Sequence, residues 1–130
     1  MIEIEKLRQV MKEVSAEKGD FTLFGLFLRE ESPDKWDLVI SAPWLEKDKL
    51  KALGELVEKL SSIVGQEEVL SLSRIVTLNH DDPSLNAVLR AVQVEDRPIE
   101  FLNNNLFGLE IRHAYILRAK ESEYSRLTAT

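Results

Sequence analysis

The sequence predicts an α+β protein, a two-layer sandwich in which helices cover one face of a mostly antiparallel five-stranded sheet. Three observations lead to this prediction. Helical periodicity alternates with short runs of branched and aromatic residues. The length of 130 residues is typical of one domain. The apolar share of 44% is that of an ordinary globular chain. We therefore predict a single domain over 1–130 with the element order α-β-β-α-β-α-β-β.

The first three elements follow from apolar spacing. A helix is predicted over 2–18, where apolar residues recur at steps of three and four and form one stripe. Gly19 can end this helix. Residues 21–30 are apolar on both faces, which is typical of a strand central in a sheet. Residues 36–41 predict a second strand, and the short connection favours an antiparallel hairpin.

The middle of the chain adds a long helix over 46–64, a strand over 69–78 and a short helix over 83–92. The short helix has the clearest start. The side chain of Asp82 can accept an unpaired backbone N–H, and Pro83 suits the first helical position.

The last third predicts a strand hairpin. Residues 98–102 read as a short strand, and residues 106–118 as a long one. Asn103–Asn105 favour a turn between them, because asparagine tolerates left-handed backbone. The polar residues 119–130 are expected to fray.

Composition excludes several classes of function. Seventeen basic against 23 acidic residues give a net charge of −6, which argues against a nucleic-acid partner. The absence of cysteine excludes disulfides, cysteine-based zinc sites, iron–sulfur clusters and thiol nucleophiles. No run approaches the roughly 18 apolar residues of a membrane span, and no secretory signal is visible. We expect a soluble cytoplasmic protein with no membrane partner and no cofactor.

Residues 5–65 contain the most suggestive motif, a glycine inside an apolar strand followed by an aspartate on the next strand. This stretch resembles a minimal nucleotidyltransferase of the polymerase-β-like group, in which two carboxylates hold Mg²⁺ for a nucleotide. Gly25 matches the family glycine and Asp37 the second carboxylate. Leu26 and Lys35 depart from the pattern, so the resemblance implies a degenerate domain without catalysis. The alternative is two ordinary core strands.

Two histidines were weighed as site residues. His80 precedes two aspartates, but adjacent side chains rarely converge on one ion, so we predict no metal site. Strand alternation places His113 on one face with Ile111 and Tyr115. A histidine there could bind a ligand or act as a base, and the alternative is a structural histidine.

No set of residues forms a recognisable catalytic motif, so we predict no catalytic residue. The candidate ligand-binding residues are Gly25, Asp37, Arg112 and His113, and the mildly basic region 112–126 is the place to expect an anionic partner. Trp44 is a candidate protein contact. The favoured function is a non-enzymatic interaction or regulatory module that acts through a homodimer or a protein partner. The alternative is a degenerate nucleotidyltransferase-like domain that binds a nucleotide or a partner.

Overall fold

The computed structural model describes residues 3–31, 34–95, 97–106 and 109–121. In these residues the chain forms a five-stranded sheet and four α-helices. The elements in chain order are α1 (Ile4–Lys18), β1 (Leu23–Arg29), β2 (Trp36–Ser41), a 3₁₀ turn (Pro43–Leu45), α2 (Lys49–Val64), α3 (Gln66–Leu70), β3 (Leu72–Thr77), α4 (Pro83–Ala91), β4 (Ile99–Leu106) and β5 (Leu109–Ala119). The prediction of an α+β fold with five strands is confirmed.

The sheet is mixed, with the strand order β3-β2-β1-β5-β4. β1 pairs antiparallel with β2 and β5, and β4 pairs antiparallel with β5, whereas β2 and β3 are parallel. The prediction of a mostly antiparallel sheet is therefore wrong. The reason lies in the helical connection from β2 to β3, because a crossover along one face returns the chain in its original direction.

The predicted order of elements also misses α3. Residues 66–70 form this short helix where the sequence predicts the start of a strand over 69–78. The strand is accordingly shorter and begins at Leu72. Gly65, in left-handed backbone at φ 95°, separates α3 from the long helix α2.

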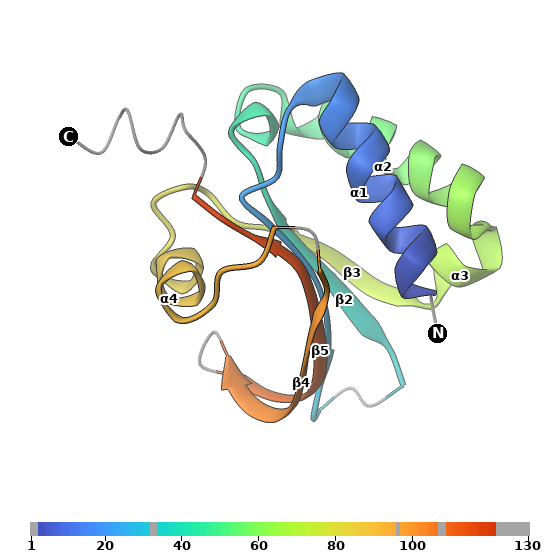
Figure 1. The fold of residues 1–130 in the computed structure, drawn as a ribbon. Helices are drawn as coiled ribbons and strands as arrows, with labels where there is room; N and C mark the ends of the chain where they lie inside the picture. The colour runs from blue at the N-terminus through green and yellow to red at the C-terminus, as the bar shows by residue number, and fades with distance from the viewer. Residues whose placement is uncertain (1–2, 32–33, 96, 107–108, 122–130) are drawn as a thin grey trace.

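Helices lie on both faces of the sheet, so the prediction of helices on one face is wrong as well. Figure 1 shows α1 and α2 side by side on one face and α4 on the other. The cause is visible in the central strands, since every residue of β2 and all but the last of β1 are buried. Strands that are apolar on both sides need cover on both sides.

Two hydrophobic clusters fill the space between these layers. The α1/α2 cluster contains Leu7, Val10, Met11, Val14, Phe21, Phe24, Leu26, Leu28, Trp36, Leu38, Ile40, Ala42, Leu45, Ala52, Leu56, Leu60, Val64 and Leu117. The α4 cluster contains Leu23, Phe27, Val39, Leu85, Val88, Val94, Ile111, Ala114, Ile116 and Ala119. Alternate residues of β1 and β2 thus serve different clusters, as the period of two in a strand requires.

The long helices are fixed to each other by charge as well as by apolar contact. Lys18 of α1 lies 2.6 Å from a carboxylate oxygen of Glu55 of α2, and Lys59 of α2 lies 3.1 Å from Glu17 of α1. Leu50, in the first turn of α2, is apolar but 85% exposed. The buried face is instead centred on Leu56 and its neighbours one turn away.

The C-terminal hairpin differs from its prediction at the asparagines. Asn103–Asn105 lie inside β4 instead of forming a turn, with Asn103 in left-handed backbone at φ 52°. The connection from β4 to β5 includes residues 107 and 108, which lie outside the described residues. Ala119 completes β5 and is buried, while 122–130, predicted to fray, also lie outside the described residues. Among the described helices, none is long and apolar enough to cross a membrane.

Two glycines provide a matched test of this packing. A Cβ built on Gly25 would lie 2.8 Å from the ring of Phe27, whereas a Cβ on Gly54 of α2 would meet nothing within 4 Å. We expect Gly25→Ala to lower the free energy of unfolding by about 1–3 kcal/mol through overpacking. Gly54→Ala should raise it by about 0.5–1 kcal/mol by removing backbone freedom. Urea denaturation of both variants measures these changes, and equal effects would contradict the close approach at Gly25.

Candidate functional site

A pocket of about 90 Å³ opens on the α4 side of the sheet, beside β1, β2 and β3. Its walls come from three adjacent strands, β5 and the first turn of α4. The lining residues are Phe27, Arg29, Asp37, Val39, Arg74, Val76, Leu78, Ser84 and Ile111. Most of these side chains are apolar, and three of them carry a charge.

The charged residues meet because of strand register. Asp37 of β2 lies beside Phe27 of β1 and beside Arg74 of β3, so these side chains share one face of the sheet. Arg29 lies two residues beyond Phe27 and therefore points to the same face. A carboxylate between two guanidinium groups is the direct result.

Asp37 is the buried member of this group, with 3% of its surface exposed. Its Oδ2 atom accepts a hydrogen bond of 2.7 Å from Nε of Arg29, and Nε of Arg74 lies 3.3 Å from the same oxygen. The other oxygen, Oδ1, is buried and has no hydrogen-bond partner among the described residues. A buried acceptor without a partner costs about 1–3 kcal/mol.

The two arginines differ in exposure. The Arg29 side chain is 15% exposed and also donates from Nη1 to Glu31. Burial lowers the pKa of Arg29, but the charge of Asp37 and the hydrogen bond to it outweigh burial and leave the pKa above its ordinary value. The Arg74 side chain is about half exposed at the mouth of the pocket.

Gly25 contributes to the pocket indirectly. It lies in the centre of β1, opposite Val39 on one side and Ile116 on the other. The ring of Phe27 lies against the Cα of Gly25, in the space where a Cβ would stand. The structure therefore brings Gly25 and Asp37, two of the predicted ligand-binding residues, to the same face, but only Asp37 lines the pocket.

His113 lies on the opposite face. Its ring packs 5.4 Å from the ring of Trp36 and 4.6 Å from that of Tyr115, measured between centroids. The sequence placed Ile111 on this face too, which is wrong, because Ile111 belongs to the α4 cluster. A bulge in β5 between the partners of Leu28 and Arg29 shifts the alternation by one residue.

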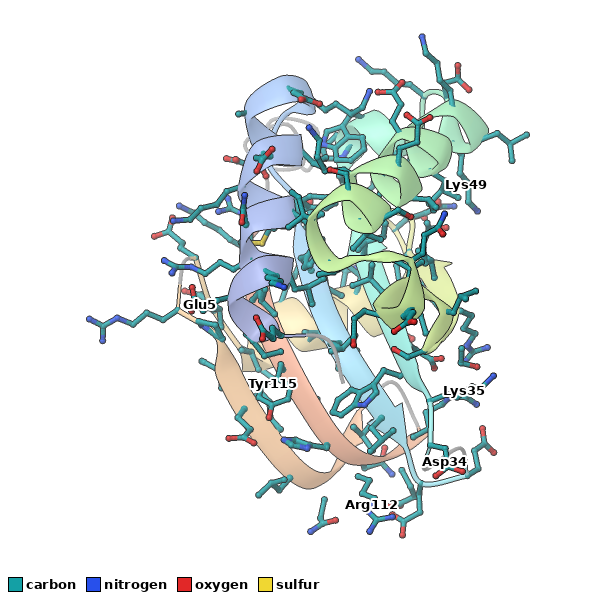
Figure 2. The ribbon with its side chains drawn as sticks, turned by 90° about the vertical axis from the view of Figure 1, so that its right-hand side faces the viewer. Glu5, Asp34, Lys35, Lys49, Arg112 and Tyr115 are labelled. Carbon is teal, nitrogen blue, oxygen red and sulfur yellow. The ribbon has the colours of Figure 1, made fainter. Side chains whose placement is uncertain are left out.

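Glu100 of β4 contacts both His113 and Tyr115. Its Oε2 lies 2.5 Å from Nε2 of His113. Burial first, and a hydrogen bond to Glu100 second, raise the pKa of Tyr115 above its ordinary value. Figure 2 shows Tyr115 on the strands beyond the end of α1 where Glu5 lies.

Arg112 is exposed and does not line the Asp37 pocket. The two described cations that follow it, Arg118 and Lys120, have partners within the chain. Arg118 donates from Nε to the carbonyl of Phe21 at 2.5 Å, and Lys120 pairs with Glu95. Residues 122–126 lie outside the described residues. An anionic partner at this region stays a prediction.

Trp44 forms contacts within the molecule. Its Nε1 donates a hydrogen bond of 2.9 Å to the carbonyl of Gly19, and its ring meets that of Phe21 edge-on at 5.1 Å. Lys18 lies 6.0 Å from the ring centroid. The side chain thus fixes the end of α1 to the 3₁₀ turn after β2, and a contact with a partner stays a prediction.

The residues around His80 have structural partners. Asp82 caps α4 by accepting a hydrogen bond of 2.8 Å from the backbone N–H of Ser84, which confirms the predicted helix start at Pro83. Nδ1 of His80 lies 2.8 Å from Glu46. Within the described part of the chain, no group of three His, Cys, Asp or Glu side chains is placed to hold a metal ion.

Sequence reasoning missed Arg29, Arg74 and Glu100. A signal was present for Arg29, which follows an apolar strand run at the start of the predicted hairpin that carries Asp37. The role of Arg74 can be recognised only once the strand order is known. Arg74 is 37 residues from Asp37 in the sequence and meets it through the parallel pairing of β2 and β3. Glu100 likewise depends on the register of β4 on β5.

Comparison with known proteins gives no match: no family model, no curated protein and no solved structure corresponds to this chain.

Loss of the Asp37 charge should destabilise the fold. Asp37→Asn leaves two guanidinium groups without their shared carboxylate, and we expect the free energy of unfolding to fall by about 2–3 kcal/mol. This expected loss of stability is smaller than the usual cost of breaking a fully buried ion pair, because Arg74 is half exposed. Asp34→Asn, at an exposed position (Figure 2), should change stability by less than about 0.5 kcal/mol. Equal effects in urea denaturation would contradict the role of Asp37.

The pKa of His80 offers a separate test of the Glu46 contact. The hydrogen bond to Glu46, followed by its charge, raises the pKa of His80 above its ordinary value, and Asp81 adds a smaller effect. A raised pKa means that this contact stabilises the fold below the unfolded-state pKa and that its contribution is lost as pH rises through the folded-state pKa. In an NMR titration, Glu46→Gln should lower the pKa of His80 more than Asp81→Asn does. The reverse order would contradict the geometry.

Proposed function

We propose that the protein is a non-enzymatic binding module that holds a small organic molecule in the Asp37 pocket. The observation that carries this proposal is Oδ1 of Asp37, a buried carboxylate oxygen of a pocket-lining residue, with no partner among the described residues. A ligand with an O–H or N–H group supplies the missing hydrogen bond and removes the cost of leaving this acceptor unpaired.

The walls favour an organic ligand over a water molecule at this position. Val39, Val76 and Ile111 surround the carboxylate with apolar surface. An amphipathic molecule that bonds to Oδ1 also buries apolar surface against these walls, which a water molecule does not.

The surroundings of Asp37 favour binding over metal-dependent catalysis. The resemblance to a nucleotidyltransferase assigns this residue to a Mg²⁺ site. Its Oδ2 is instead shared by Arg29 and Arg74, and two neighbouring guanidinium charges repel a divalent cation. Nucleotide binding therefore enters the test as a competing outcome.

A pocket-filling substitution tests the proposal. We expect isovaleramide and benzyl alcohol at millimolar concentration to shift the methyl NMR signals of Val39, Val76 and Ile111. Val76→Phe should occupy the pocket and weaken this binding at least about tenfold, because the aromatic ring takes the ligand's space. Val57→Phe makes the same change on α2, at a valine that is 37% exposed, and should leave binding unchanged.

Thermal melts of both variants establish that each remains folded. The proposal is wrong if neither probe shifts the pocket signals in the unsubstituted protein, or if both variants bind alike. Shifts caused instead by ATP with Mg²⁺, and lost when Mg²⁺ is removed, would favour the nucleotidyltransferase-like alternative.

A further inference from the structure

Within the described part of the chain, Arg74 has unpaired hydrogen-bond donors at the mouth of the pocket. Its contact with Asp37 uses Nε alone, and its two terminal nitrogens have no partner among the described residues. The guanidinium plane presents these nitrogens in the fixed fork that matches a carboxylate. Because the side chain is about half exposed, an incoming anion can reach it without displacing the strand.

The charge of the pocket lining calls for an anion. Arg29 and Arg74 contribute two positive charges and Asp37 contributes one negative charge, so the lining carries a net charge of +1. Glu31 contacts Arg29 directly from outside the pocket, so Arg29 already has two carboxylate partners. Arg74 shares only Asp37 among the described residues, so a ligand with a single negative charge is best placed at Arg74.

Among the described residues, Oδ1 of Asp37 lacks a hydrogen-bond donor, and the neighbouring charges favour a neutral donor over a cationic one. The carboxylate already faces two guanidinium groups on its Oδ2 side. An ammonium at Oδ1 would add a third positive charge in a small apolar pocket, which is costly at low local dielectric. A neutral O–H or N–H gives Oδ1 its hydrogen bond without that repulsion.

We propose that the pocket binds a monocarboxylate that carries a neutral O–H or amide N–H beside its carboxylate and a branched or aromatic apolar group. The carboxylate pairs with the terminal nitrogens of Arg74, the neutral donor bonds to Oδ1 of Asp37, and the apolar group lies against Val39, Val76 and Ile111. Both 2-hydroxy acids and N-acyl amino acids have this chemistry. The inference rests on the proposed function and adds the ligand class to it.

The donor and the carboxylate have to be close together in the ligand. Arg74 and Asp37 are neighbours across the β2–β3 pairing, and Nε of Arg74 is 3.3 Å from Oδ2 of Asp37. Because the two side chains are in contact, a molecule that touches both needs its two polar groups close together. This requirement favours a donor at the carbon next to the carboxylate over one at the far end of the molecule.

A ligand series removes one group at a time. The reference compound is 2-hydroxy-4-methylpentanoate, measured by titration calorimetry on the full chain. 4-Methylpentanoate lacks the donor, 2-hydroxy-4-methylpentanamide lacks the negative charge, and leucine replaces the neutral donor with an ammonium. We expect each of the three to bind at least about tenfold more weakly than the reference. Comparing the affinity of N-acetylleucine with that of 2-hydroxy-4-methylpentanoate distinguishes N-acyl amino acids from 2-hydroxy acids as the ligand.

Arg74→Gln provides the matched variant. It should bring the affinities for the acid and for its amide to within about twofold of each other, because the amide never used the positive charge. Arg90→Gln removes an exposed arginine of α4 and should leave the preference for the acid intact. A circular dichroism melt shows that both variants are folded.

The results separate the ligand class from the function itself. If isovaleramide and benzyl alcohol occupy the pocket but the hydroxy acid and its amide bind equally, the ligand class is wrong and the binding function stands. If the acid is preferred but Arg74→Gln preserves the preference, the assignment of the carboxylate to Arg74 is wrong. If no compound of either series perturbs the pocket, both proposals fall.

Discussion

Two adjacent strands without a polar face constrain the rest of this molecule. β1 and β2 are buried on both sides, so each side of the sheet needs its own cover. α1 and α2 provide it on one face and α4 on the other, which makes three layers of a chain of only 130 residues. The helical crossover that sets β3 parallel to β2 belongs to the same solution, because α2 has to cross the sheet to cover it.

The covering layers also explain where the pocket lies. α4 is a short helix whose buried residues, Leu85 and Val88, reach only part of the sheet on its side. The end of β1 and β2 beyond this helix is where Arg29 and Asp37 replace apolar residues in the alternation. A charge in a buried strand is tolerated where a partner is at hand, and the parallel neighbour β3 brings Arg74 to it.

Local pattern predicted most elements, and pairing explains most of the errors. The cap at Asp82 and the boundaries of β2 were correct because each depends on a few consecutive residues. The parallel partner of β2 and the bulge near Arg112 depend on strands far apart in sequence, so no local signal reveals them. Asp37 was selected through a family resemblance, yet its partners Arg29 and Arg74 became visible only when the sheet was assembled.

The ion pairs of Asp37 are incomplete. Arginine–carboxylate pairs are frequently bidentate, with two parallel hydrogen bonds to the two oxygens. Here both arginines approach the same oxygen through Nε, at 2.7 and 3.3 Å, and leave the other oxygen buried and unpaired. Burying a charge in this half-satisfied state is less stable than either a complete salt bridge or an apolar pair. In the proposed binding function, a ligand that bonds to the second oxygen completes the contacts that stabilise this part of the sheet.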